Sequence, residues 1–329
     1  MSPRRLLVTG ITLVVAGLSL VACGLPSDDT AHSISPDAVP FDLLAPSSTT
    51  VPDTPQGADT DVVNLYFQND ERLLAVPAEV DAHRPVHVLV NDRTPGLPGS
   101  RNCGAAAATA PVLGFCDDDD LWLPSKARRQ LDLLATTGSD TVVCGLELEV
   151  DGTPFARPGS EPLLRYAHLL RSRRIEANMV AALVRTAAFW DEIGPLDEHI
   201  PGGFAEDYDW MLRAARHQPV PVVVDPLIRV RWVVRSHFRQ QWPSWEAALR
   251  QVVDRNPEFS GEPRGRARVE GQIAVAIAAQ GRRRDALRQI RTTLGWSMLE
   301  PRAAIALAIV AGVPAERLAA ALNRRGHGI

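Results

Sequence analysis

Strand-like apolar runs and segments with helical spacing alternate along the middle of the chain. Three apolar runs have the length and composition of buried strands, at 85–91, 111–116 and 141–150. Helical spacing lies between them, at 101–110 and at 123–137. Residues 92–100 contain four Gly or Pro residues and predict a loop. Strands that alternate with helices in this way predict a parallel-type α/β sheet.

The second half of the chain changes gradually to helical patterns. Residues 205–218 predict a helix, and residues 219–232 predict one strand followed by another. From about residue 241 onward the spacing is helical throughout. Residues 271–294 carry small apolar residues at helix spacing with a Gly-containing break, which predicts antiparallel helix pairs.

The N-terminus has the pattern of an export signal. Two arginines precede an apolar stretch with small residues at its end, and Leu20 to Cys23 resembles a bacterial lipobox. We therefore expect residues 1–23 to be a lipoprotein signal peptide, Cys23 to be lipidated, and the protein to be anchored to the cell membrane. The alternative is an uncleaved anchor helix, for which the segment is short.

Residues 24–83 differ from the rest of the chain. Residues 24–60 are rich in Pro, Ser, Thr and Asp and predict a disordered linker. Two short strands are predicted at 62–67 and 72–80, around a polar turn.

Composition excludes some functions. The chain of 329 residues is 45% hydrophobic and has a net charge of −4, which gives no reason to expect a nucleic-acid partner. Apart from Cys23, three cysteines remain, at 103, 116 and 144, and they predict buried thiols.

A run of four carboxylates follows the apolar strand at 111–116. Asp117 to Asp120 would repel one another, and a hard divalent cation such as Mg²⁺ or Mn²⁺ would relieve that repulsion. A cation at the end of such a strand would suit a bound diphosphate. A solvated loop with a helix cap is the alternative.

Two further segments carry candidate chemistry. Glu206 and Asp207 begin a predicted helix after Pro201–Gly203, where a carboxylate is either a helix-start charge or a general base. Arg101 follows the Gly/Pro loop and is either a surface residue or a phosphate ligand.

These three segments occur in the order of a known family. The RNxG segment at 101–104, the Asp-x-Asp element before Trp122 and the GxxEDxD form at 203–209 together resemble a family 2 glycosyltransferase of the GT-A type. The resemblance covers residues 84–329. It implies an α/β fold with a truncated GT-A (Rossmann-like) sheet over 84–240, flanking helices, and a helical C-terminal region over 241–329.

The resemblance also implies roles for individual residues. Asp119 and Asp117 match the metal pair, with Mn²⁺ or Mg²⁺ as the cofactor, and Asp207 matches the catalytic base with Glu206 beside it. Donor binding would involve Asp117 and three further residues: Arg101, Asn102 and His237. The implied reaction is a metal-dependent, inverting transfer of a sugar from a nucleotide-diphosphate sugar to an acceptor hydroxyl.

The chain departs from this family before residue 84, where the family's N-terminal nucleotide-binding βαβ unit is not found. Residues 1–82 instead resemble the start of an actinobacterial GerMN-type lipoprotein, and 61–83 would be a fragment of that domain. Lipid anchoring places the protein outside the membrane, whereas the glycosyltransferase part alone would be expected in the cytoplasm. A fusion of two truncated proteins accounts for both features. The alternatives to an enzyme are a non-catalytic surface lipoprotein and an inactive fusion product.

Overall fold

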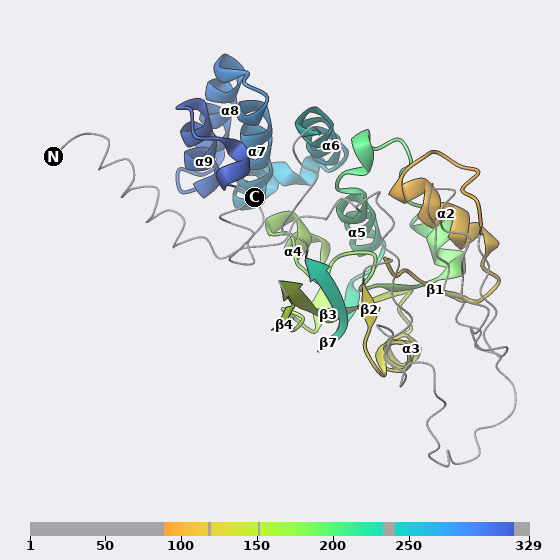
Figure 1. Ribbon diagram of the computed structural model, residues 1–329. Helices are drawn as coiled ribbons and strands as arrows, with labels where there is room; N and C mark the ends of the chain where they lie inside the picture. Colours follow the sequence, from red (N-terminus) through yellow and green to blue (C-terminus); the bar gives the residue numbers. More distant parts are fainter. Residues whose placement is uncertain (1–88, 118–119, 151, 233–240, 319–329) are drawn as a thin grey trace, which may run out of the picture.

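A computed structural model describes residues 89–117, 120–150, 152–232 and 241–318 (Figure 1). Several predicted features lie outside the described residues: the signal with Cys23, the linker, the strands at 62–67 and 72–80, Asp119 and His237. Among the described helices, none is long and apolar enough to cross a membrane.

The described part contains a seven-stranded sheet with the order β1-β6-β3-β7-β2; β4 pairs with β3, and β5 pairs with β7. The strands are β1 (Val112–Gly114), β2 (Leu121–Trp122), β3 (Thr141–Val150), β4 (Thr153–Arg157), β5 (Leu163–Leu164), β6 (Leu183–Arg185) and β7 (Val220–Trp232). Of the described strand pairs, only β3 with β7 is parallel, and the others are antiparallel.

The sheet is therefore mixed, and the prediction of a parallel-type sheet was wrong in this respect. Strand β4 follows β3 through a two-residue hairpin, with Val150 opposite Thr153, and such a short connection forces an antiparallel pair. The two strands predicted at 219–232 are the single strand β7. Its register against β3 shifts at Gly145, opposite Pro226, which has no N–H to donate.

The strand predicted at 85–91 is not observed over its described residues. Residues 89–91 have no strand pairing, and the Val90 side chain is 85% exposed. The Asn91 side chain accepts a hydrogen bond from the Arg93 N–H and donates one to the Thr94 carbonyl. These local contacts turn the chain, which a hydrophobic pattern does not reveal.

Four helices accompany the sheet: α2 (Leu97–Ala107), α3 (Lys126–Thr137), α4 (Tyr166–Arg171) and α5 (Glu206–His217). Helices α3 and α5 confirm the predictions made for their segments. Helix α2 begins inside the segment predicted as loop, because Pro98 is tolerated in a first helical turn. Gly99 is required there, since a Cβ would lie 1.9 Å from the Thr94 carbonyl oxygen.

The C-terminal region is helical, as predicted, with α6 (Trp242–Arg255), α7 (Pro263–Ala279), α8 (Arg283–Trp296) and α9 (Pro301–Val310). Helix α7 packs against α6, α8 and α9, and also against α4 below them in Figure 1. One hydrophobic cluster runs from β1 and β6 through α5 into these helices. The helical region therefore shares its core with the α/β part.

Cys103 and Cys144 are buried free thiols, as predicted, whereas Cys116 is only half-buried. Lys126, the only lysine of the chain, is also buried, with its Nζ 3.8 Å from the Trp122 ring centroid. This amine has no hydrogen-bond partner in the described part of the chain. Burial lowers the pKa of Lys126 from an ordinary value of 10.5 to about 8.

This pKa predicts a pH-dependent stability. The folded chain holds the Lys126 proton more weakly than the unfolded chain, so the unfolded chain binds more protons between pH 8 and 10.5. Stability should therefore rise with pH across that window, on the order of 3 kcal/mol from this residue. Urea unfolding of wild type and Lys126→Met should show the rise only in wild type. Arg128→Met, at an exposed position of the same helix, is the control, and an equal rise in Lys126→Met would contradict the expectation.

Candidate functional site

The first turn of α5 brings Glu206 and Asp207 into the interior. Ala205, directly before them, takes a left-handed conformation with φ 57°, which is unusual for a residue with a Cβ. Each of the two acidic residues is 6% exposed. They are therefore not the solvated helix-start charges that one interpretation of the sequence allowed.

Arg101 of α2 joins the acidic run to this helix. Its Nη2 donates to Asp117 Oδ1 at 2.7 Å, and its Nη1 donates to Glu206 Oε1 at 3.0 Å. Burial of the guanidinium lowers the pKa of Arg101, but Asp117 and Glu206 together outweigh this effect and raise the pKa above its ordinary value. One arginine thus connects the three segments that carry the candidate chemistry.

The Glu206 carboxyl titrates near neutrality. Burial raises the pKa of Glu206 to about 7, and the neighbouring Asp207 carboxylate adds to this effect, although Arg101 and Arg173 oppose it. A carboxyl with such a pKa exchanges its proton near physiological pH. Perturbed groups of this kind are concentrated at functional sites.

Arg173 holds Asp207, and sequence reasoning did not identify it. Its Nη2 donates to both carboxylate oxygens of Asp207, at 2.8 and 2.6 Å. Asp207 also accepts a hydrogen bond from the Tyr208 N–H at 2.7 Å. Arg173 is one of four arginines between 165 and 174 with no motif spacing, so no sequence signal distinguishes it from the other three.

Asn102, beside Arg101, is buried, and its side chain fixes a neighbouring loop. It donates to the Leu196 carbonyl and to Glu198 Oε1, both at 2.8 Å, and accepts the Leu196 N–H at 3.1 Å. Its role in donor binding stays a prediction.

The two described residues of the acidic run, Asp117 and Asp120, lie close together between β1 and β2. The Asp120 N–H donates to the Asp117 carbonyl at 3.1 Å, and Trp122 Nε1 donates to the Phe115 carbonyl at 3.2 Å. The Arg231 N–H of β7 donates to the Asp120 side chain. Asp118 and Asp119 lie outside the described residues.

Asp117 has the oxygen donors that Mg²⁺ and Mn²⁺ prefer, and its side chain is 29% exposed. Among the described residues, no group of three or more His, Cys, Asp or Glu residues is arranged to hold a metal ion. The carboxylate of Asp117 is thus a suitable ligand for a hard cation. A metal site formed by Asp117 and Asp119 stays a prediction.

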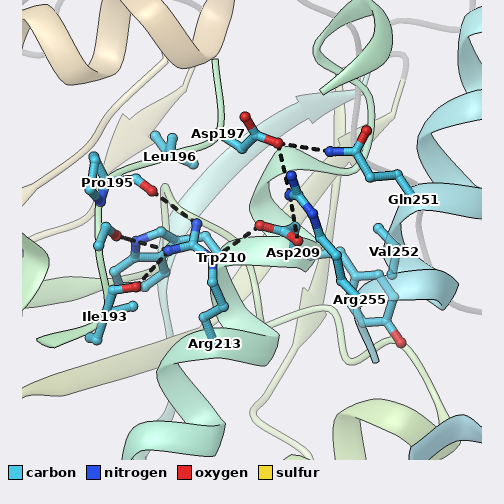
Figure 2. A network of polar contacts seen from close by, with 12 residues as sticks. Ile193, Pro195, Leu196, Asp197, Asp209, Trp210, Arg213, Gln251, Val252 and Arg255 are labelled. Atoms are coloured by element: carbon cyan, nitrogen blue, oxygen red, sulfur yellow. Dashed lines mark hydrogen bonds and ion pairs between the residues drawn. The ribbon is translucent and has the colours of Figure 1, made fainter. Parts of the chain in front are cut away.

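A second polar network fixes α5 to its surroundings (Figure 2). The buried Asp209 accepts from Arg213 Nε at 3.1 Å and pairs with Arg255 of α6 at 3.4 Å. Arg213 donates in turn to three consecutive backbone carbonyls, those of Ile193, Gly194 and Pro195. Arg255 also pairs with Asp197 at 2.7 Å. The network secures the segment that leads to Glu206, and Asp209 itself is structural.

Removal of the buried Asp209 carboxylate should be destabilising. Asp209→Ala removes the shared partner of Arg213 and Arg255, which are partly exposed and keep their other partners, and we expect a loss of about 2 kcal/mol in the free energy of unfolding. Urea denaturation measures the loss. Asp285→Ala, which breaks two ion pairs on the surface of α8, is the control and should lose much less. Equal losses for the two variants would contradict the assignment.

A family model and solved structures resemble this chain. The family model described as glycosyl transferase family 2 matches residues 69–190. The match begins earlier than residue 84; it includes Arg101 and Asp117 and ends before Glu206. No curated protein matches the chain.

Among solved structures, the fragment 1–349 of S. aureus TarS in complex with UDP-GlcNAc has a TM-score of 0.52 and 12% sequence identity. The match covers 83% of this chain and 85% of that chain. The same fragment with UDP has a TM-score of 0.45 and 14% identity, and the match covers the same fractions of the two chains. At these identities the likeness concerns the fold. Residues 69–190 thus match the family model described as glycosyl transferase family 2, in a chain whose mixed α/β fold resembles that of S. aureus TarS.

Proposed function

We propose that the chain transfers a sugar from a nucleotide-diphosphate sugar to an acceptor hydroxyl. The observation that carries this proposal is the position of Arg101, within 2.7 Å of Asp117 and 3.0 Å of Glu206. Residues separated by 105 positions in the chain meet at this guanidinium. The family match and the fold supply the reaction class.

Asp207 is the proposed base. It would take the proton of the acceptor hydroxyl while the hydroxyl oxygen attacks the anomeric carbon of the sugar. The bond between that carbon and the diphosphate breaks on the opposite face, so the configuration inverts. Glu206, with a pKa of about 7, donates no proton to the acceptor in this scheme, and its contact with Arg101 helps to keep this guanidinium in place.

The donor would lie between α2 and the acidic loop. Arg101 and Asn102 approach it from α2, and Asp117 and His237 complete the proposed contacts; TarS, which has this fold, is known in complex with UDP-GlcNAc. A divalent cation, Mn²⁺ or Mg²⁺, held by Asp117 and Asp119 would neutralise charge on the departing nucleoside diphosphate.

Calorimetry with UDP-GlcNAc and Mn²⁺ tests the proposal. Wild type should bind the nucleotide sugar, and EDTA or Asp119→Ala should weaken binding by about tenfold or more, because the metal no longer bridges protein and diphosphate. Asp207→Asn should bind within a few-fold of wild type but lose about 10²–10⁴ in turnover.

Asp132→Asn, at an exposed position of α3, is the matched control and should bind as wild type does. If no nucleotide-diphosphate sugar binds to wild type, the reading as a non-catalytic lipoprotein or an inactive fusion product replaces this proposal. Binding that survives both EDTA and Asp119→Ala would contradict the metal.

We also propose that the protein is lipid-anchored through Cys23 and lacks the first βαβ unit of the family, which would impair turnover. The support is the lipobox at Leu20–Cys23 and the sequence before residue 84, which has no βαβ pattern.

Metabolic labelling with a lipid precursor tests the anchor. Label should enter wild type and the control Cys103→Ala, whose cysteine is a buried core thiol, but not Cys23→Ala, because only a lipobox cysteine accepts the lipid. Equal labelling of all three proteins, or labelling of none, would exclude the anchor.

A further inference from the structure

Arg268, on helix α7 of the C-terminal region, contacts the residue that follows the candidate base. Arg268 is buried on α7, and its Nη2 donates to the Tyr208 hydroxyl at 2.7 Å. Tyr208 directly follows Asp207 on α5, and its hydroxyl donates to the Leu169 carbonyl of α4 at 2.7 Å. Three helices therefore meet at one tyrosine hydroxyl.

The Tyr208 ring also packs against Arg173, the arginine that binds the Asp207 carboxylate. The Cζ atoms of Arg268 and Arg173 lie 5.4 and 5.6 Å from the ring centroid, within the range of cation–π attraction. Arg173 in turn donates to both oxygens of Asp207. The contacts form a chain from α7 through Tyr208 and Arg173 to the Asp207 carboxylate.

The approach of α7 to this point is built into its backbone. A Cβ at Gly265 would lie 1.9 Å from the Leu170 carbonyl oxygen, so only glycine lets α7 lie this close to α4. Arg268 follows one helical turn later, between the fully buried Ala267 and Val269. The close contact therefore fixes where the Arg268 side chain enters the core.

Arg268 is costly to keep in this position. Burial, together with the like charges of Arg302 and Arg173, lowers the pKa of its guanidinium. Within the described residues it has no carboxylate partner, and its Nε has no hydrogen bond. A buried cation whose hydrogen bond goes only to a neutral hydroxyl opposes folding. The position of Arg268 is better explained by its contacts with Tyr208 than by a contribution to the stability of the fold.

We propose that Arg268 is a positioning residue for the base, and that helix α7 is thereby a working part of the active site. The inference rests on the proposed function, in which Asp207 takes the acceptor proton. Arg268 fixes the Tyr208 ring, the ring orients the Arg173 guanidinium, and Arg173 sets the direction of the Asp207 carboxylate. Small errors in such an orientation reduce turnover more than donor binding.

Kinetics of five variants test the inference. Arg268→Gln should lower kcat by about tenfold or more with donor KM within about threefold, because the base is misdirected while the donor site is intact. Arg268→Lys, which can still donate to the hydroxyl, should recover most of the loss. Tyr208→Phe should resemble Arg268→Gln, and the double variant should be no worse than either single one. The control is Arg264→Gln, at an exposed position of the same helix, which should leave kcat unchanged.

Hydrogen exchange gives a readout that needs no turnover. The amides of residues 206–209 should exchange faster in Arg268→Gln than in Arg264→Gln, while thermal unfolding of both stays cooperative. An inactive wild type would defeat the proposed function alone, and exchange would still decide the role of Arg268. If Arg268→Gln does not fold, Tyr208→Phe and Arg268→Lys decide. Unchanged kcat and exchange, or equal losses in kcat and donor affinity without rescue by lysine, would overturn the inference.

Discussion

The buried guanidinium of Arg101 is the contact on which the arrangement of the site depends. It lies between Asp117, at the end of the edge strand β1, and Glu206, in the first turn of α5. Arg101 and Glu206 are both buried, and a buried charge is costly unless it is paired. Arg101 therefore depends on its carboxylate partners, of which Asp117 is partly exposed. Because the three residues come from three separate elements, their ion pairs also fix α2, the acidic loop and α5 relative to one another.

The same principle recurs along α5. Its first turn contains three acidic residues, and each is paired with an arginine from elsewhere or from the next turn: Glu206 with Arg101, Asp207 with Arg173, and Asp209 with Arg213 and Arg255. The Asp209 network also includes backbone carbonyls (Figure 2). Glu206 directly follows the left-handed Ala205 and is linked to Asp117 through Arg101. Position in the helix therefore decides which carboxylate is connected to the acidic run.

The C-terminal helices are packed onto the α/β part of the chain. They share one hydrophobic cluster with β1, β6 and α5, and α7 lies against α4 through Gly265. A detachable tail would keep its own core and leave the site unchanged when removed. Here the core is continuous, and Arg268 crosses from α7 to the tyrosine beside the candidate base. This continuity makes the helical region part of the same folding unit as the α/β part.

The sequence by itself determined the types of most elements and the identity of the candidate residues. Helices α3 and α5 and strand β3 follow from periodicity, because hydrophobic spacing reports which face of an element is buried. Tertiary structure decided the rest. Strand direction depends on connections such as the hairpin after Val150, and at the described end of the run 85–91 the Asn91 side chain makes local hydrogen bonds instead of strand pairing. Burial of Lys126 and the pairing of Arg173 with Asp207 depend on contacts across the fold, which residue type does not encode. Local pattern specifies which side chains turn inward, whereas the partner that each buried charge finds depends on how distant segments pack.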